Sequence, residues 1–287
     1  MAEVVAREVR FNVLRMGAGS PAIVCVHGLA IDNHSSFYLT LAPALARQAS
    51  VVLYDLRGHG LSEQPERGYT IDDMAADLYA IIDALQLRDQ PVVVLGHSLG
   101  GYIALRFAAS YPGRAAGLIL IESPSGLADI GEQMAACLTL SGEARIRKIE
   151  ELFTHWLTKH VSRGTEVPAD DARVDDARAM YGHVQRHRQR RRNPLIETST
   201  RLMENTQFVA DMSGASALDD AAIASIDCPV LALYGADSDR RDDAERLARL
   251  LPRCELQLIP GCAHGVLFNA TQKVRASILE WLPRIRG

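Results

Sequence analysis

Short apolar runs alternate with longer helical patterns along most of the chain. The runs that have the length and β-rich composition of strands are 9–14, 22–26, 51–54, 92–95, 117–121, 230–234 and 255–259. Between several of them, apolar residues recur every three or four positions, as in 71–85, where Thr70 can cap the first turn. Strands that alternate with helices predict a mostly parallel α/β sheet with helices on both faces.

The strand pattern disappears between residue 123 and about residue 210. Helical patterns replace it at 132–138, 144–159, 174–192 and 195–208, with prolines at 124, 168 and 194. An insertion between two core strands is expected to form a lid over the carboxyl ends of the strands. The sequence therefore predicts a core made of 1–122 and 211–287 and a helical cap made of 123–210. Its apolar residues, among them Phe208, are expected to face the core or to line an acyl pocket.

The pentapeptide at 96–100 has the pattern Gly-x-Ser-x-Gly around Ser98. It follows a buried apolar run and precedes a helical pattern at 101–108. In this context the pattern describes a nucleophile elbow, a tight turn that holds the serine hydroxyl clear of the sheet and needs glycines where a Cβ would clash. Ser98 is therefore predicted to be a nucleophile.

A serine hydroxyl becomes a good nucleophile only when a base takes its proton and donors stabilise the oxyanion that follows. Of the nine histidines, His264 alone follows a late apolar run in a loop before the final helix, which is the context of a general base. The turn at Gly28 follows the run at 22–26 and can aim the backbone N–H of Leu29 at the same point as that of Leu99. Leu29 and Leu99 are therefore the expected oxyanion hole.

These motifs resemble the signatures of the α/β-hydrolase superfamily and occur in its order. The matching segments are 24–28, 54–62, 96–101 and 260–264. The resemblance implies a mostly parallel α/β-hydrolase sheet with helices on both faces, a helical lid insertion and a serine catalytic triad. Within it, Asp55 and Arg57 look like a structural turn after a strand, and they are expected to form a local ion pair rather than to act in catalysis.

The acid of the triad is where the chain departs from the family pattern. The acid usually stands at the position of Ser238, and here Asp237 and Asp239 flank that position. Glu122 competes with them, because some members, including thioesterases that resemble polyketide chain-terminating domains, carry the acid there. A glutamate that closes an aliphatic strand is costly unless it meets a partner such as the imidazole N–H of His264. Glu122, Asp239 and Asp237 all remain open as the acid.

Composition agrees with an enzyme that folds without metals or disulfides. The chain has 287 residues, of which 48% are hydrophobic, enough for a full α/β core and an insertion. A net charge of −4 gives no global reason to expect binding to nucleic acid or to membranes. Five cysteines without clustered spacing indicate a reducing compartment. Because no signal peptide or membrane span is visible, a cytoplasmic location is expected, and no cofactor is implied.

The segment 170–192 has an uneven distribution of charge. Aspartates stand at 170, 171, 175 and 176, and arginines at 186, 188, 190, 191 and 192. Acids at the start of a helix and bases at its end complement the helix dipole, which is a sufficient explanation. The alternative is that the arginines dock an acidic acyl carrier protein or the phosphates of a coenzyme.

Together these observations predict a capped serine hydrolase that cleaves an acyl ester or, preferably, a thioester, including acyl chains bound to a carrier protein or to coenzyme A. Ser98 attacks, His264 transfers the proton, and Glu122 or Asp239 orients the imidazole. One alternative is a carbon–carbon bond hydrolase with the same triad and lid. Another is a member of the fold that binds a small molecule without catalysis.

Overall fold

The computed structural model describes residues 2–29, 32–144, 147–148, 151–152, 194–215 and 217–285. In this part of the chain one eight-stranded sheet has the order β1-β2-β4-β3-β5-β6-β7-β8. The strands are β1 (Ala2–Ala6), β2 (Val9–Met16), β3 (Ala22–Val26), β4 (Ser50–Tyr54), β5 (Val92–His97), β6 (Gly117–Ile121), β7 (Val230–Gly235) and β8 (Cys254–Ile259). β1 pairs antiparallel with β2 and β2 antiparallel with β4, and the other pairs are parallel. The prediction of a mostly parallel sheet is confirmed.

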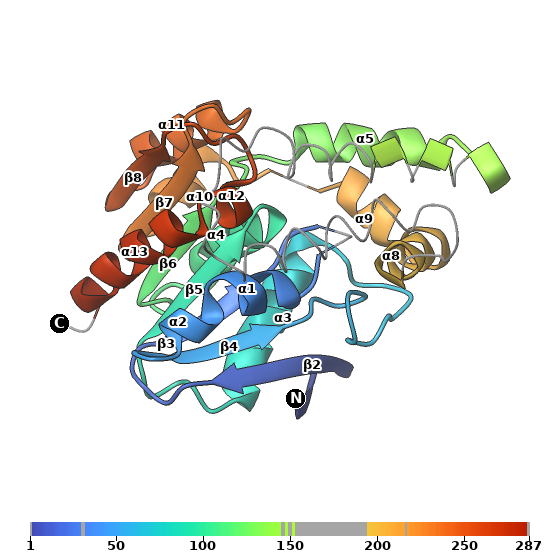
Figure 1. Ribbon diagram of the computed structural model, residues 1–287. Helices are drawn as coiled ribbons and strands as arrows, with labels where there is room; N and C mark the ends of the chain where they lie inside the picture. The colour runs from blue at the N-terminus through green and yellow to red at the C-terminus, as the bar shows by residue number, and fades with distance from the viewer. Residues whose placement is uncertain are drawn as a thin grey trace, which may run out of the picture.

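Helices cover both faces of the sheet (Figure 1). One face carries α3 (Ile71–Ala84), α4 (Leu99–Ser110), α10 (Asp220–Ala224) and α11 (Arg241–Leu250). The other carries α1 (Ser35–Thr40), α2 (Ala42–Leu45), α12 (Val266–Asn269) and α13 (Thr271–Trp281), which continues into a 3-10 turn at Leu282–Ile285. Successive strand residues alternate between the two cores, as Val24 and Cys25 of β3 do. Because both faces are buried, the central strands are mostly apolar.

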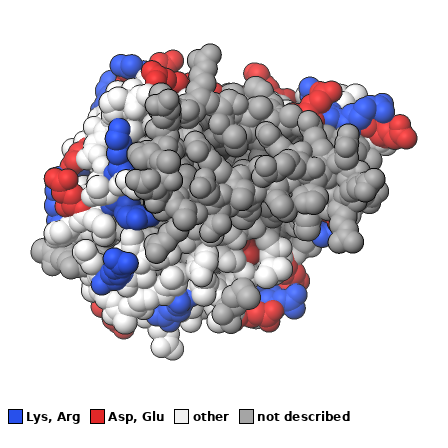
Figure 2. Space-filling model, in the orientation of Figure 1, with Lys and Arg blue, Asp and Glu red and all other residues white. Residues whose placement is uncertain are grey.

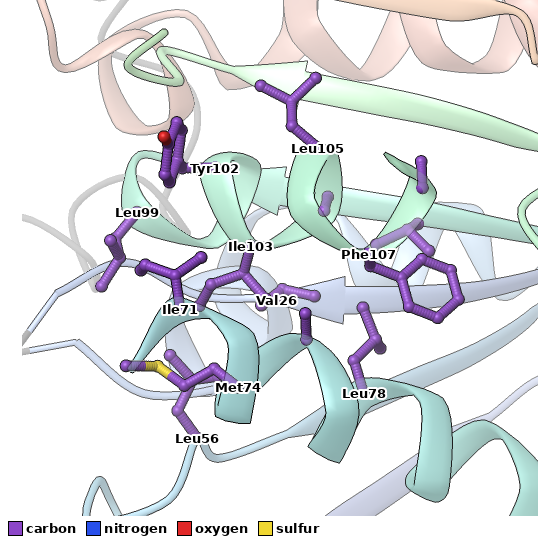
Figure 3. Packing of buried hydrophobic residues seen from close by; sticks show 14 of the residues in the cluster. Val26, Leu56, Ile71, Met74, Leu78, Leu99, Tyr102, Ile103, Leu105 and Phe107 are labelled. Carbon is purple, nitrogen blue, oxygen red and sulfur yellow. The ribbon is translucent and has the colours of Figure 1, made fainter. Parts of the chain in front are cut away.

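Packing between α3 and α4 fixes the start of α4, which follows Ser98 directly. Figure 3 shows Leu99 and Ile103 of α4 beside Ile71 and Met74 of α3, and Leu99 is fully buried. The predicted N-terminal cap of α3 is confirmed, since the Thr70 side chain accepts the backbone N–H of Asp73 at 3.1 Å. The first turn of α4 is thus held in the core by its own apolar side chains.

Besides α10, three helices described in the structure lie between β6 and β7, at or next to the predicted insertion. They are α5 (Ala128–Leu138), α8 (Pro194–Asn205) and α9 (Phe208–Ser213), and α9 packs against both α5 and α8 (Figure 1). The Phe208 ring contacts that of Tyr69 at 5.7 Å, and the Tyr69 N–H donates to the Asp211 carboxylate. The helices predicted at 144–159 and 174–192 fall mostly or wholly outside the described residues, so the cap boundaries remain a prediction.

The expected ion pair between Asp55 and Arg57 is wrong, because each side chain has a different partner. The Asp55 carboxylate lies 2.7 Å from Nδ1 of His34 and accepts a hydrogen bond from the Asn12 amide. The Arg57 guanidinium makes two bonds, of 2.5 and 2.6 Å, to the carboxylate of Asp77 in α3. This buried pair ties the loop after β4 to α3. Asp55 and Arg57 therefore hold the local structure through separate partners and not through a pair with each other.

The described part of the chain has a surface of mixed charge and free thiols. Figure 2 shows basic and acidic side chains interspersed around the described part of one face. The five cysteines are free thiols. None of the described helices has the length and apolar character needed to cross a membrane.

Candidate active site

Ser98 occupies a strained turn between β5 and α4. Its backbone has φ of +51° and ψ of −122°, a conformation that residues other than glycine rarely adopt. The Ser98 N–H donates to the carbonyl of Ile121 in β6 at 2.9 Å, and the Ser98 carbonyl accepts the N–H of Gly101. The sheet ladder thus continues one residue past β5 and holds the strained residue in place. Strain that the surrounding structure maintains is frequent at functional sites.

The glycines around Ser98 are required by close approach of other backbone segments. A Cβ on Gly96 would lie 2.4 Å from the carbonyl oxygen of Gly100, and one on Gly100 would lie 2.0 Å from that of Val26. A Cβ on Gly101 would lie 2.6 Å from the Ser123 side chain. Contacts under 3 Å would force the backbone apart. The predicted elbow geometry is therefore present, and it brings the end of β3 against the start of α4.

The turn that follows β3 lies beside the elbow. A Cβ built on Gly28 would be 3.5 Å from Cβ of Ser98. Nε2 of His27 accepts the N–H of Leu56 at 2.9 Å, and its Nδ1 faces the carbonyl of Gly28 at 2.9 Å. These two bonds fit a neutral imidazole that carries its proton on Nδ1. The arrangement fixes the turn that contains Leu29, whose N–H is the expected oxyanion donor together with that of Leu99.

Asp32 is a largely buried carboxylate near this turn, and it was not among the residues predicted from the sequence. Its Oδ2 accepts the N–H of Gly28 at 2.8 Å and lies 3.7 Å from Nδ1 of His97. Burial alone would raise the pKa of Asp32, but the nearby His97 imidazole and the hydrogen bond from the Gly28 N–H hold it well below its usual range. Asp32 is therefore an ionised anchor for the turn that carries Leu29. A single aspartate in a loop gives no periodic or motif signal by which sequence reasoning could find it.

Glu122 and His264 meet at the carboxyl end of the sheet. Glu122 follows β6, is fully buried, and has a positive φ of +52°. Its Oε2 lies 3.0 Å from Nδ1 of His264, which stands in the loop after β8. The ring centroid of His264 is 6.3 Å from that of His97, the residue before Ser98. The structure therefore brings the predicted base and one predicted acid together beside the elbow.

Two further donors hold the Glu122 carboxylate. The backbone N–H of Gly235 donates to Oε1 at 2.5 Å, and the hydroxyl of Ser238 donates to Oε2 at 2.5 Å. Burial raises the pKa of Glu122 to about 7, while these two bonds oppose the shift because they favour the charged form. The carboxylate therefore carries its charge above neutral pH.

The two aspartates that compete with Glu122 are placed differently. The backbone N–H of Asp237 donates to the carbonyl of Cys262 at 3.0 Å. Asp239 acts on Glu122 through its charge, which raises the pKa of Glu122 further. The carboxylate that lies 3.0 Å from Nδ1 of His264 is that of Glu122, so the geometry favours Glu122.

The described residues contain no group of three or more histidine, cysteine, aspartate and glutamate side chains arranged to hold a metal ion. Cys262, close to His264 in sequence, is buried, and burial raises the pKa of its thiol. It is thus a poor nucleophile at neutral pH.

Comparison with known proteins identifies the family. The chain is 28% identical over 264 residues to a 2-(acetamidomethylene)succinate hydrolase of Mesorhizobium japonicum, with 90% of this chain and 86% of that protein covered. Its fold is similar to those of a meta-cleavage product hydrolase from Pseudomonas fluorescens (TM-score 0.72, 21% identity, 99% and 98% covered) and a thermophilic esterase from Thermogutta terrifontis (TM-score 0.74, 20% identity, 100% and 99% covered). The family model described as alpha/beta hydrolase fold matches residues 21–271. The chain therefore belongs to the α/β-hydrolase family.

Proposed function

We propose that this hydrolase is a serine enzyme that cleaves an acyl ester or thioester through an acyl-enzyme intermediate. The observation that carries the proposal is the buried hydrogen bond between Glu122 and Nδ1 of His264, next to the strained turn at Ser98. A carboxylate on Nδ1 keeps the proton there, and this leaves Nε2 free to act as a base. A nucleophile, a base and a group that orients the base are the three parts that acyl transfer needs.

In the proposed reaction, Oγ of Ser98 attacks the acyl carbonyl while Nε2 of His264 takes its proton. The backbone N–H groups of Leu29 and Leu99 stabilise the resulting oxyanion, each typically contributing on the order of 10² to 10³ in rate. His264 then gives the proton to the departing alcohol or thiol. Water, activated by the same imidazole, releases the acid and restores Ser98. Glu122 stays ionised throughout and stabilises the imidazolium.

The helices between β6 and β7 are part of the same proposal. We assign residues 123–210 to a cap that shapes the acyl pocket, supported by the docking of α9 on the loop after β4 through Phe208 and Tyr69. The preference for a thioester bound to an acidic carrier depends on the arginines at 186–192, which lie outside the described residues. A cytoplasmic site of action is supported by the free cysteines.

The test is a substrate panel given to the purified protein. It contains an acyl ester and an acyl thioester with the same chain, and a compound in which a ketone lies beside the carbon–carbon bond to be broken. Ser98→Ala is the inactive variant, and Ser225→Ala, an exposed serine at the end of α10, is the matched control. Turnover of ester or thioester by the wild type and the control, but not by Ser98→Ala, supports the proposal. Turnover of the carbon–carbon substrate alone, or binding without turnover, overturns it.

A further inference from the structure

Ser238 is a buried serine whose hydroxyl shares a carboxylate oxygen with the proposed base. Its Oγ lies 2.5 Å from Oε2 of Glu122, and Nδ1 of His264 lies 3.0 Å from the same oxygen. The side chain is only 7% exposed. The hydroxyl is therefore placed to affect how Glu122 meets His264, although it touches neither the substrate nor Ser98 in the proposed reaction.

The direction of the Ser238 hydroxyl is fixed by a second bond. Its Oγ accepts the backbone N–H of Arg240 at 3.1 Å, so its one proton is free to point at Glu122. The Arg240 side chain pairs with Asp129 of α5 at 2.6 Å and with Asp243 of α11 at 3.3 Å. The turn that carries Ser238 is thus anchored to two helices, which limits its freedom to move away from Glu122.

The Glu122 carboxylate is held at both oxygens. The Gly235 N–H binds Oε1, and Ser238 and His264 bind Oε2. Rotation of the carboxylate would break the hydrogen bond from the Gly235 N–H. Loss of the Ser238 hydroxyl would remove one of the two hydrogen bonds described at Oε2 and leave the one with His264. In a buried site, bonds to an ionised group are stronger than those between neutral groups.

We propose that Ser238 is a positioning residue, which together with the Gly235 amide holds the Glu122 carboxylate on His264 in its charged form. The inference rests on the proposed function, because it assigns Ser238 a role in the same site. It predicts that activity depends on the hydroxyl most strongly near and below neutral pH, where Glu122 takes up a proton.

Several other titratable groups act on Glu122 and stay the same when Ser238 is changed. They are His264, His97 at the end of β5, Tyr234 of β7, Asp239 after β7 and Cys262 after β8. A shift produced by substitution of Ser238 alone therefore reports on its hydroxyl.

The test compares Ser238→Ala with the wild type, Ser238→Thr and the control Ser225→Ala. If the lost hydrogen bond favours the charged form of Glu122 by about 1.4 kcal/mol, its loss raises the pKa of Glu122 by about one unit. We therefore expect the acid limb of kcat/KM for Ser238→Ala to move about one unit higher, with a roughly tenfold loss below pH 7 and little loss at pH 9. KM should stay near the wild-type value, and Ser238→Thr, which keeps a hydroxyl, should restore most of the profile.

A second measurement does not depend on turnover. Carbon-13 NMR of labelled glutamate should show the Glu122 carboxyl titrating about one unit higher in Ser238→Ala than in the wild type. An unchanged titration and acid limb in Ser238→Ala, or an equal loss at every pH, would overturn the inference. Failure of the proposed function would appear differently, as activity that survives in Ser98→Ala.

Discussion

Glu122→Gln is the substitution that most sharply tests the assignment of the acid. The Gly235 N–H donates to Oε1, so the amide oxygen of the glutamine must take that place. The amide NH2 then stands where Oε2 accepts from Ser238 and His264. A donor at this place forces Nδ1 of His264 to accept, which puts the imidazole proton on Nε2. Nε2 of His264 then already carries a proton, so it cannot take the proton of Ser98.

In a serine protease, changing the triad aspartate to asparagine produces this wrong tautomer and lowers kcat by a factor on the order of 10⁴. That factor corresponds to about 5 kcal/mol of transition-state stabilisation. We expect a loss of the same order for Glu122→Gln, because Gly235 fixes the amide in the harmful orientation.

The assay is kcat/KM for an ester across pH 6 to about 9, with thermal unfolding to show that the variant folds. Asp239→Asn and Asp237→Asn are the matched acid-to-amide controls, and both should stay within about tenfold of the wild type. Near-normal activity of Glu122→Gln, together with a large loss in Asp239→Asn, would show that Asp239 and not Glu122 is the acid.

Two further predictions follow from buried charges. Because burial raises the pKa of Glu122 to about 7 and His264 needs the charged carboxylate, kcat/KM should rise with pH through about 7, and a profile that is flat from pH 5 would contradict this. Arg57→Ala breaks the buried pair with Asp77 and should cost about 1.5 to 3 kcal/mol in the free energy of unfolding, because Asp77 keeps Arg7 as a second partner. Arg67→Ala, which removes an exposed pair with Glu66, should leave the melting temperature nearly unchanged, and equal losses in the two variants would refute this.

Much of the core could be predicted because local patterns determine it. The apolar runs of β3 to β7 are strands because both faces of a parallel sheet are buried, which leaves a continuous apolar signal. The motif around Ser98 was equally informative, because the contacts a Cβ would make at Gly96 and Gly100 explain why glycines must stand there. In both cases the sequence signal and its physical cause lie in the same short segment.

The partners of buried charges could not be predicted in the same way. Glu122 and Asp239 both follow strands at the carboxyl edge of the sheet, and only the three-dimensional arrangement shows which one meets His264. Arg57 finds its partner Asp77 twenty residues later on α3, and Ser238 acts through one hydroxyl in a loop. Long-range pairing of single side chains leaves no periodic pattern in the sequence.

The proposed function depends above all on Ser98 being a nucleophile that His264 activates. The most direct measurement treats the folded protein with a phosphonate ester and locates the adduct by peptide mass spectrometry. We expect a single adduct on Ser98, no adduct in Ser98→Ala, and labelling slowed by on the order of 10³ or more in His264→Ala. An adduct on another residue, or equal labelling of Ser98→Ala and the wild type, would contradict this expectation.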